Sequence, residues 1–148
     1  MQQTLILLKP DAVHRRLVGR VIARFEAKGL RLVGLKLMAA TRDLAEKHYA
    51  VHKGKPFYES LLTFLTSGPT VALVLEGREA VSACRTLMGV TDGAKAAPGT
   101  VRGDYGLSVQ NNLVHGSDSP ENATAEIALW FTPAELARYP LTDASWVG

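Results

Sequence analysis

The sequence predicts an α/β (α+β) domain in which helices cover a sheet of four strands. Short apolar runs bounded by Gly, Pro and polar residues are typical of buried strands, and apolar side chains at helical spacing are typical of amphipathic helices. The two patterns alternate along the chain, which favours layers of helix and sheet. The chain has 148 residues, 47% of them apolar and 21% charged, without an internal repeat or a flexible linker. We therefore expect a single domain over residues 1–148 with a core of its own.

Four segments have the pattern of strands. Residues 4–8 and 71–75 are continuous apolar runs, as expected for strands buried on both faces. Residues 112–115 could form a short strand. In residues 30–40 two sets of side chains alternate, as they do in a strand: Val33, Leu35 and Leu37 against Gly34, Lys36 and Met38.

Helices are predicted where apolar side chains recur at i, i+3, i+4 and i+7. Glycines end two of them, Ser119 and Pro120 begin another, and residues 132–135 form a capping box that opens a last short helix. The apolar stripes are Val18, Val21, Ile22 and Phe25 before Gly29; Tyr58, Leu61, Leu62 and Leu65 before residues 67–69; Ala80, Cys84, Leu87 and Met88 before Gly89; and Ala123, Ile127 and Trp130.

The order of these elements is strand, helix, strand, helices, strand, helix, strand, helix. If two adjacent antiparallel strands lie at the centre, the fold is a ferredoxin-like four-stranded antiparallel sheet covered by helices, and this is the topology we expect. The pattern by itself leaves the strand order open.

Composition and charge exclude several classes of protein. No apolar run approaches the roughly 20 residues of a membrane span, and residues 4–8 are too short for a signal-peptide core, so we expect no membrane partner and a cytoplasmic location. The single cysteine, Cys84, excludes an internal disulfide and a cysteine metal cluster. The net charge of +3 is small and its Lys and Arg residues are scattered, so no specific nucleic acid is expected.

The most unusual segment is His-Gly-Ser-Asp-Ser at residues 115–119, just before a helix start. Imidazole is largely uncharged at neutral pH, so a ring nitrogen has a free lone pair for nucleophilic attack. A carboxylate would have to fix the tautomer of His115, and Glu126 on the following helix could point back at it. Taken alone, a histidine in a loop is more often a surface residue.

Other signals narrow the chemistry. Neither the phosphate loop G-x-x-x-x-G-K-[ST] nor the dinucleotide turn G-x-G-x-x-G is present. Residues 89–110 are rich in Gly, Pro, Asp and Thr, and structureless segments of this length are usually functional. His14, His48 and His52 lack a setting like that of His115, so we interpret them as surface or helix residues.

Six motifs, in this order, resemble those of the nucleoside diphosphate kinase family. The similarity runs from the first strand to Trp146, and its two longest strings are highly specific. The motifs are Leu-Lys-Pro-Asp at 8–11, Lys-Pro-Phe-Tyr at 55–58, Ser-Gly-Pro at 67–69, Arg-Thr-Leu-Met-Gly at 85–89, Pro-Gly-Thr-Val-Arg-Gly-Asp at 98–104 and Asn-Leu-Val-His-Gly-Ser-Asp-Ser at 112–119.

The resemblance implies that His115 accepts the γ-phosphate of a nucleoside triphosphate and passes it to a nucleoside diphosphate, with ping-pong kinetics and broad base and sugar specificity. The implied substrates include ATP, GTP, ADP and GDP, and the implied cofactor is Mg²⁺. The site residues implied are Lys9, Arg85 and Arg102 for the phosphates, Thr91 and Asn112 as hydrogen-bond donors, Phe57 beneath the base, Tyr49 near the site, Ser117 and Glu126 around the histidine, and Asp118 for Mg²⁺ through water.

Without the resemblance, each of these cations would more often be a solvated charge and Phe57 a core aromatic residue. Two other functions compete. A non-catalytic nucleotide-binding or scaffolding relative would be expected to lack His115 or a phosphate-binding arginine. A nucleic-acid binder would need a clustered basic face with interleaved aromatic residues, and the sequence has none.

Two positions depart from the family pattern. Asp92 and Gly93 follow Thr91 where the family often has Asn-Pro, and Ala12 follows Asp11 where Gly is common. The first departure leaves open the rigidity and subunit contacts of that loop. The resemblance also implies a homo-oligomer, either a tetramer or a hexamer, and residues 143–146 are similar to the tail of longer members that form hexamers.

Overall fold

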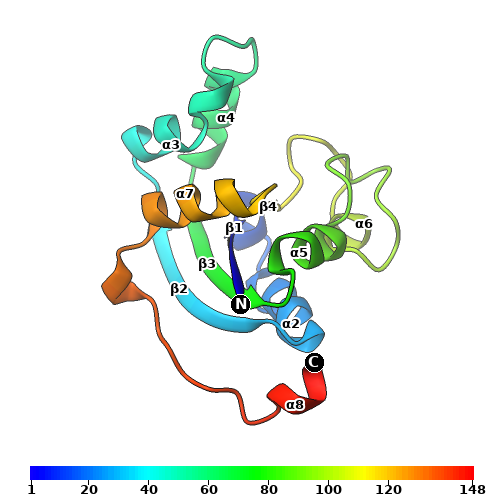
Figure 1. The fold of residues 1–148 in the computed structure, drawn as a ribbon. Helices are drawn as coiled ribbons and strands as arrows, with labels where there is room; N and C mark the ends of the chain where they lie inside the picture. The colour runs from blue at the N-terminus through cyan, green and yellow to red at the C-terminus, as the bar shows by residue number, and fades with distance from the viewer.

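Helices cover both faces of one four-stranded sheet (Figure 1). The computed structural model describes residues 1–148. The elements, with η for a 3-10 turn, are β1 (Gln2–Leu8), α1 (Pro10–His14), α2 (Val18–Lys28), β2 (Arg31–Ala39), α3 (Arg42–His48), η1 (Ala50–His52), α4 (Tyr58–Leu65), β3 (Pro69–Gly77), α5 (Ala80–Met88), α6 (Val101–Tyr105), β4 (Val114–Gly116), α7 (Pro120–Trp130), η2 (Pro133–Glu135) and α8 (Ala144–Val147).

The strand order is β2-β3-β1-β4, and every neighbouring pair is antiparallel. The two central strands, β3 and β1, are therefore adjacent and antiparallel, which confirms the predicted ferredoxin-like sheet. Residues 5–8 of β1 are fully buried, as the continuous apolar run predicts for a strand covered on both faces.

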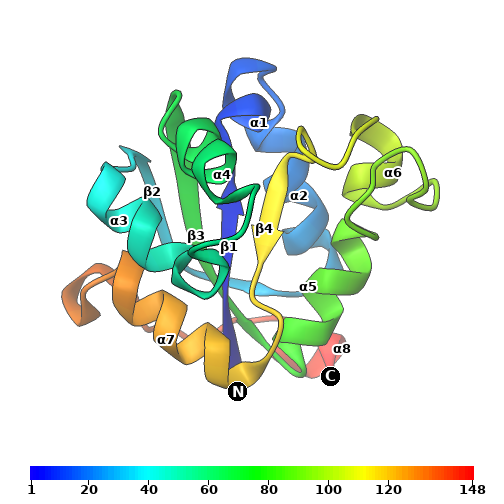
Figure 2. The ribbon, with the colours of Figure 1, turned by 90° about the horizontal axis from the view of Figure 1, so that it is seen from above.

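Different helices cover the two faces of the sheet (Figure 2), and each face has its own core. Alternate side chains of β1 point to opposite faces, so Ile6 and Leu8 belong to one core while Leu5 and Leu7 belong to the other. Helices α1, α2 and α5 cover the first core, and α3, α4 and α7 cover the second. The candidate site residues His115 and Glu126 lie on the side of the second core.

The predicted helix boundaries are confirmed where local chemistry sets them. Gly29 follows α2 with a φ of 105°, the left-handed conformation that glycine adopts without a steric penalty. The Ser119 hydroxyl accepts a hydrogen bond from the backbone N–H of Asn122 at 3.1 Å, and Pro120 opens α7. The sequence pattern did not indicate α1, α3, α8, or α6 inside the long segment that follows Gly89, because these helices are short.

Strand β2 differs from simple alternation. Leu32 lies opposite Leu75 and Gly34 opposite Val74, so Val33 is an extra residue, a β-bulge. A bulge moves the residues beyond it to the other face. Val33 therefore packs into the second core, whereas Leu35 and Leu37 face the other side, where their exposures are 53% and 65%. The prediction that Val33, Leu35 and Leu37 share one face of the strand is therefore wrong.

Among the helices, none is both long enough and apolar enough to cross a membrane.

Candidate active site

His115 lies on the short edge strand β4, directly opposite Leu7 of β1. Its neighbours Val114 and Gly116 are buried, whereas 24% of its own side chain is exposed. Residues directly opposite one another in an antiparallel pair share a face of the sheet. Because Leu7 belongs to the second core, the strand pairing directs His115 toward α3, α4 and α7.

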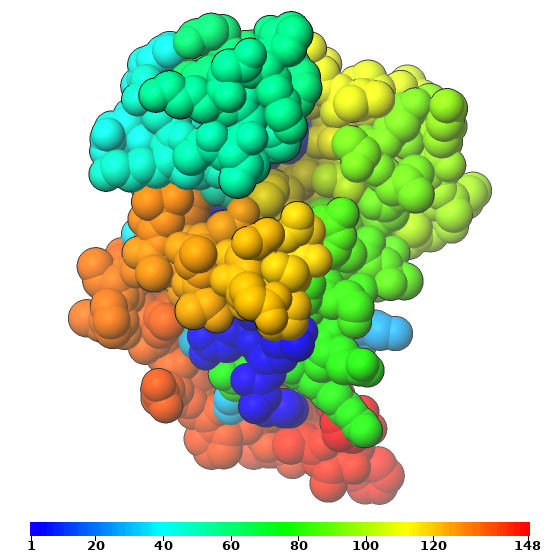
Figure 3. All heavy atoms as spheres, turned by 45° about the horizontal axis from the view of Figure 1, so that its top comes forward, coloured from blue at the N-terminus to red at the C-terminus, as the bar shows by residue number.

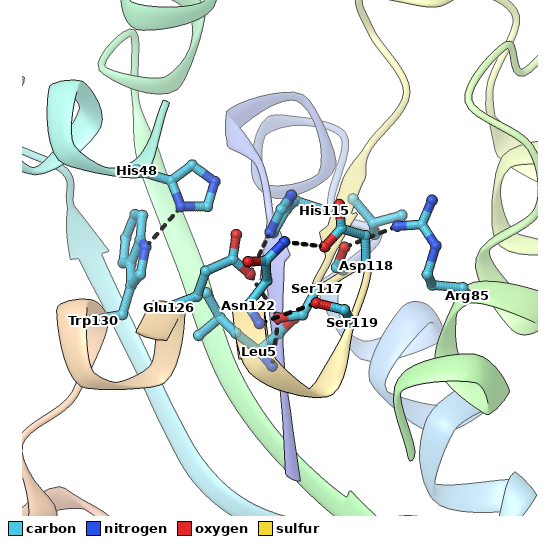
Figure 4. Close-up of polar contacts among 12 residues, drawn as sticks. Leu5, His48, Arg85, His115, Ser117, Asp118, Ser119, Asn122, Glu126 and Trp130 are labelled. Carbon is cyan, nitrogen blue, oxygen red and sulfur yellow. Dashed lines mark hydrogen bonds and ion pairs between the residues drawn. The ribbon is translucent and has the colours of Figure 1, made fainter. Parts of the chain in front are cut away.

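Glu126, on the second turn of α7, points back at His115 (Figure 4). Its Oε1 atom accepts a hydrogen bond from Nε2 of His115 at 3.1 Å and another from the Ser117 hydroxyl at 2.6 Å. The Ser117 oxygen accepts in turn from the backbone N–H of Leu5 at 3.3 Å. The three predicted residues thus form one network, and β1 anchors it.

Glu126 remains a carboxylate in this network. Burial pushes its pKa up, but the hydrogen bond and the attraction from His115, together with the Ser117 bond, outweigh burial and bring the pKa below its usual value. A carboxylate only accepts hydrogen bonds, so Nε2 of His115 must carry the ring proton. The lone pair of the neutral ring is then on Nδ1, which has no partner in the protein.

His48, the last residue of α3, lies beside His115 (Figure 4). Its ring meets that of His115 edge-on, with centroids 4.5 Å apart and planes at 79°. Its Nδ1 accepts a hydrogen bond from the Trp130 indole N–H at 3.1 Å. His48 is a helix residue, as predicted, but its place beside His115 was not predicted, because α3 and β4 meet only through the fold and no local pattern connects them.

The surroundings of His48 keep it uncharged. Burial, reinforced by repulsion from His115, lowers its pKa to about 3. Nδ1 is used as an acceptor from Trp130, so the proton of the neutral ring lies on Nε2. The ligand atoms of His48, His115 and Glu126 all lie within 4.8 Å of one another, a donor set that suits zinc. The hydrogen bonds from Trp130, His115 and Ser117 already account for this trio without a metal ion.

Lys9, between β1 and α1, is a buried cation with 7% exposure. Its ammonium group donates to the side-chain oxygen of Asn112, whose amide group donates to the carbonyl oxygen of Thr91 at 3.1 Å. Burial lowers the pKa of Lys9 to about 8; Asp11 opposes this shift and Arg102 adds to it. Two predicted phosphate-binding side chains, Lys9 and Asn112, are thus held together.

Arg102 is buried and binds three backbone carbonyl groups on two segments of the chain. Its guanidinium donates to the carbonyl oxygens of Gly89 at 2.9 Å, Asn112 at 3.2 Å and Val114 at 2.7 Å. Burial, reinforced by Arg85, lowers its pKa to about 10. Arg85 itself is exposed and donates to the carbonyl oxygen of Gly116 at 3.1 Å. Both arginines therefore lie against the strand that carries the histidine.

A recess lies between the α3–α4 pair, α7 and the chain before β4 (Figure 3), and Tyr49, Phe57 and Asp118 flank the helices that border it. Phe57 begins α4 with 46% exposure, so it is not a core aromatic residue. Tyr49 meets the His48 ring edge-on at 4.7 Å, and burial raises its pKa to about 12. Asp118 is exposed and accepts from the Asn122 amide at 2.5 Å. Thr91 contributes its carbonyl oxygen here rather than its hydroxyl.

This geometry can accept a small, strongly anionic group. A neutral imidazole has a free nitrogen, a carboxylate opposite that nitrogen can balance a positive ring, and three cations lie nearby. Such an arrangement suits transfer of a phosphoryl group, whose negative charge is spread over its oxygens.

The comparisons with known proteins agree with this chemistry. A model of the family described as nucleoside diphosphate kinase matches residues 2–136. The nucleoside diphosphate kinases of Carboxydothermus hydrogenoformans and Pelotomaculum thermopropionicum are 56% and 54% identical to this chain over 147 residues, 99% of each chain. A halophilic nucleoside diphosphate kinase from Halobacterium salinarum, solved in complex with CDP, superposes with a TM-score of 0.97 at 46% identity, covering 99% of this chain and 98% of its own. The chain belongs to the nucleoside diphosphate kinase family.

Proposed function

We propose that the chain transfers the γ-phosphate of a nucleoside triphosphate to a nucleoside diphosphate through a phosphohistidine on His115. The observation that carries this proposal is the bond between His115 Nε2 and Glu126 at 3.1 Å, because it leaves Nδ1 as the free nucleophile. In the first half-reaction an N–P bond forms at Nδ1 while the bond between the γ-phosphorus and the bridging oxygen breaks, and the diphosphate leaves. The second half-reaction reverses these steps onto another diphosphate.

The charges support both half-reactions. Phosphorylation leaves the ring of His115 positively charged, and Glu126 stabilises that charge from the Nε2 side. Ser117 holds the carboxylate by its 2.6 Å bond. Lys9, Arg85 and the remaining N–H groups of Arg102 offset the negative charge of the phosphoryl oxygens. Asn112 links Lys9 to the Thr91 loop and so keeps the phosphate-binding groups at a fixed spacing.

Mg²⁺ fits the site as part of a metal–nucleotide complex rather than in a protein cage. Bound to phosphates, Mg²⁺ keeps several waters and uses only one or two carboxylates. Asp118 is an exposed carboxylate beside the histidine strand (Figure 4), and it would hold such an ion through water. The ion would supply further positive charge to the phosphates.

Broad base specificity follows from the half-exposed ring of Phe57. Stacking tolerates any base, because every base has a π-face, and we assign no hydrogen-bonding residue to the base edge. Tyr49 supports this wall of the recess through His52, whose ring centroid lies 6.3 Å from that of Tyr49 and 5.3 Å from that of Phe57. Both cores share the strands β1 and β3, which supports the inference that residues 1–148 act as one domain.

We also infer that the chain forms a homo-oligomer through the edge strand β2. The carbonyl oxygens of Leu32 and Val33 accept from the Tyr139 hydroxyl and the Ala137 N–H. The rest of this edge presents backbone groups that can pair, and edge strands are normally protected. Beside this edge lie Leu35 and Leu37, 53% and 65% exposed on one face. A second copy of β2, running antiparallel, would cover both leucines and continue the sheet. The resulting dimer would be the repeating unit of a tetramer or a hexamer.

Incubation of the chain with γ-labelled ATP or GTP should place the label on His115. The N–P bond should be lost in acid and survive alkali, and ADP, GDP, CDP and UDP should each discharge the labelled protein. His115→Ala should form no phosphoenzyme and remain folded, whereas His14→Ala, at an exposed histidine of α1, should behave as the unaltered protein does. Substantial transfer by His115→Ala would disprove the mechanism.

Glu126→Gln should slow phosphoenzyme formation by roughly 10- to 100-fold, the usual loss when a partner that orients an imidazole is removed. Nucleotide affinity should change little, because the interaction is felt mainly in the transition state. Glu121→Gln, on an exposed first-turn residue of the same helix, is the matched control. Single-turnover phosphorylation rates measure the effect, and equal rates for the three proteins would leave Glu126 without a role.

The low pKa of Lys9, about 8, gives a pH dependence. The value of kcat/KM reports groups of the free enzyme, so it should fall above about pH 8 as the ammonium loses its proton. At saturating nucleotide the bound phosphates raise the pKa of Lys9, so kcat should fall only at higher pH. A kcat/KM that stays constant to pH 10 in the unaltered protein would contradict a role for Lys9 in binding.

The double variant Leu35→Glu, Leu37→Glu should dissociate the oligomer, because four like charges would meet across the paired β2 strands. Light scattering at several concentrations should give a multiple of the 16.0 kDa chain for the unaltered protein and smaller species for the variant. Leu107→Glu, at a leucine with 87% exposure outside β2, is the control. An unaltered mass for the double variant would exclude this interface.

A further inference from the structure

Leu113, just before β4, has a backbone conformation that residues other than glycine rarely adopt. Its φ is 74°, and across it the backbone N–H of Val114 donates to the carbonyl oxygen of Asn112 at 2.8 Å. A positive φ with this hydrogen bond defines a γ-turn of the rare, strained form. Strain of this kind persists only where the surroundings enforce it, and it is concentrated at functional sites.

Both polar backbone groups of Leu113 are bonded to residues at the junction of β1 and α1, Lys9 and Asp11. The backbone N–H of Lys9 donates to the Leu113 carbonyl oxygen at 2.8 Å. The Leu113 N–H donates to Oδ2 of Asp11 at 3.0 Å. The Leu113 side chain is fully buried in the first core. Leu113 itself is therefore held at two polar points, and only the Asp11 point uses a side chain.

The other oxygen of Asp11, Oδ1, is buried without a hydrogen-bond partner. An unpaired buried carboxylate oxygen is costly, so the Asp11 side chain is not explained by the stability of its own surroundings. Its one hydrogen bond is the bond to Leu113.

The γ-turn lies between two parts of the site. Asn112, on one side, meets the Lys9 ammonium and the Thr91 carbonyl. His115, on the other side, is two residues away. Arg102 bridges the same turn from its other flank through the carbonyl oxygens of Asn112 and Val114. A change in φ at Leu113 would therefore alter the distance between the nucleophile and the phosphate-binding groups.

We propose that Asp11 is a positioning residue that holds the Leu113 γ-turn and thereby sets the spacing between His115 and the phosphate-binding groups Lys9 and Asn112. The proposal rests on the proposed role of His115 as the phosphoryl acceptor. A competing role for Asp11 is purely electrostatic, as a negative charge near Lys9. The two roles differ in one respect: holding the turn needs an acceptor atom, whereas the electrostatic role needs a charge.

The test compares Asp11→Asn, which keeps an acceptor oxygen without charge, with Asp11→Ala, which keeps neither. Asp43→Ala is the matched control, because Asp43 is an exposed acid at the corresponding position of α3. Single-turnover phosphorylation should be about 10- to 100-fold slower in Asp11→Ala and near normal in Asp11→Asn and Asp43→Ala. The HN–Hα coupling of Leu113 should report a positive φ in Asp11→Asn and a changed φ in Asp11→Ala.

Three results would overturn the proposal: an unaltered rate in folded Asp11→Ala, an Asp11→Asn rate as slow as that of Asp11→Ala, or an unaltered Leu113 coupling in Asp11→Ala. If Asp11→Ala does not fold, Asp11→Ser, whose hydroxyl stops short of the Leu113 N–H, takes its place with the same expectations. Failure of the underlying mechanism is distinguishable, because the unaltered protein would then form no phosphohistidine at all.

Discussion

Three residue pairs between β1 and β4 determine where the chemistry takes place. The pairing of Leu7 with His115 places the histidine beside a strand whose residues 4–8 are fully buried. The same strand ends at Leu8, so Lys9 follows it directly, near the proposed nucleophile His115. Ser117 continues the contact by exchanging hydrogen bonds with Leu5 through its hydroxyl and its backbone N–H. Nucleophile, cation and carboxylate are thus positioned by a strand that tolerates little movement, because packed cores resist displacement.

The ionisation states around His115 form a consistent set. Burial disfavours the charged form of each of these side chains, so their hydrogen-bond partners decide whether they are ionised. Glu126 has two hydrogen-bond donors and stays ionised, whereas His48 has a donor on its only lone pair and stays neutral. A charged His48 would repel the positive ring that the proposed phosphorylation would create at His115. The hydrogen bond from Trp130 therefore helps to keep His48 neutral in addition to stabilising the second core.

The parts of the fold that follow from neighbours in sequence could be predicted. The stripe before Gly29 and the Ser119–Pro120 start gave α2 and α7 because caps and helical spacing are local. The bulge at Val33 could not be predicted, since it depends on the register against β3. Glu126 could be proposed as a partner of His115 because it lies on the next helix along the chain. His48 comes from a distant segment, and nothing in the sequence indicated its place beside His115. Arg102 could be assigned to phosphates by resemblance alone, whereas its bonds to three carbonyl oxygens become visible only in the structure.

The departure from the family pattern at Asp92 and Gly93 is accommodated locally. The Asp92 carboxylate accepts from the backbone N–H of Ala94 at 3.1 Å, and the Gly93 N–H donates to the Ser108 carbonyl at 3.2 Å, a bond that proline could not make. Gly93 packs so closely that a Cβ atom would lie 2.5 Å from the carbonyl carbon of Gly106. In place of a proline ring, which would restrict the backbone, this chain thus has a hydrogen bond and a close backbone contact at Gly93. The carbonyl oxygen of the preceding residue, Thr91, accepts a hydrogen bond from the Asn112 amide, and Asn112 in turn binds Lys9. The local contacts of Asp92 and Gly93 therefore help to fix the residue that holds Lys9, so the altered loop can still support the proposed phosphate site.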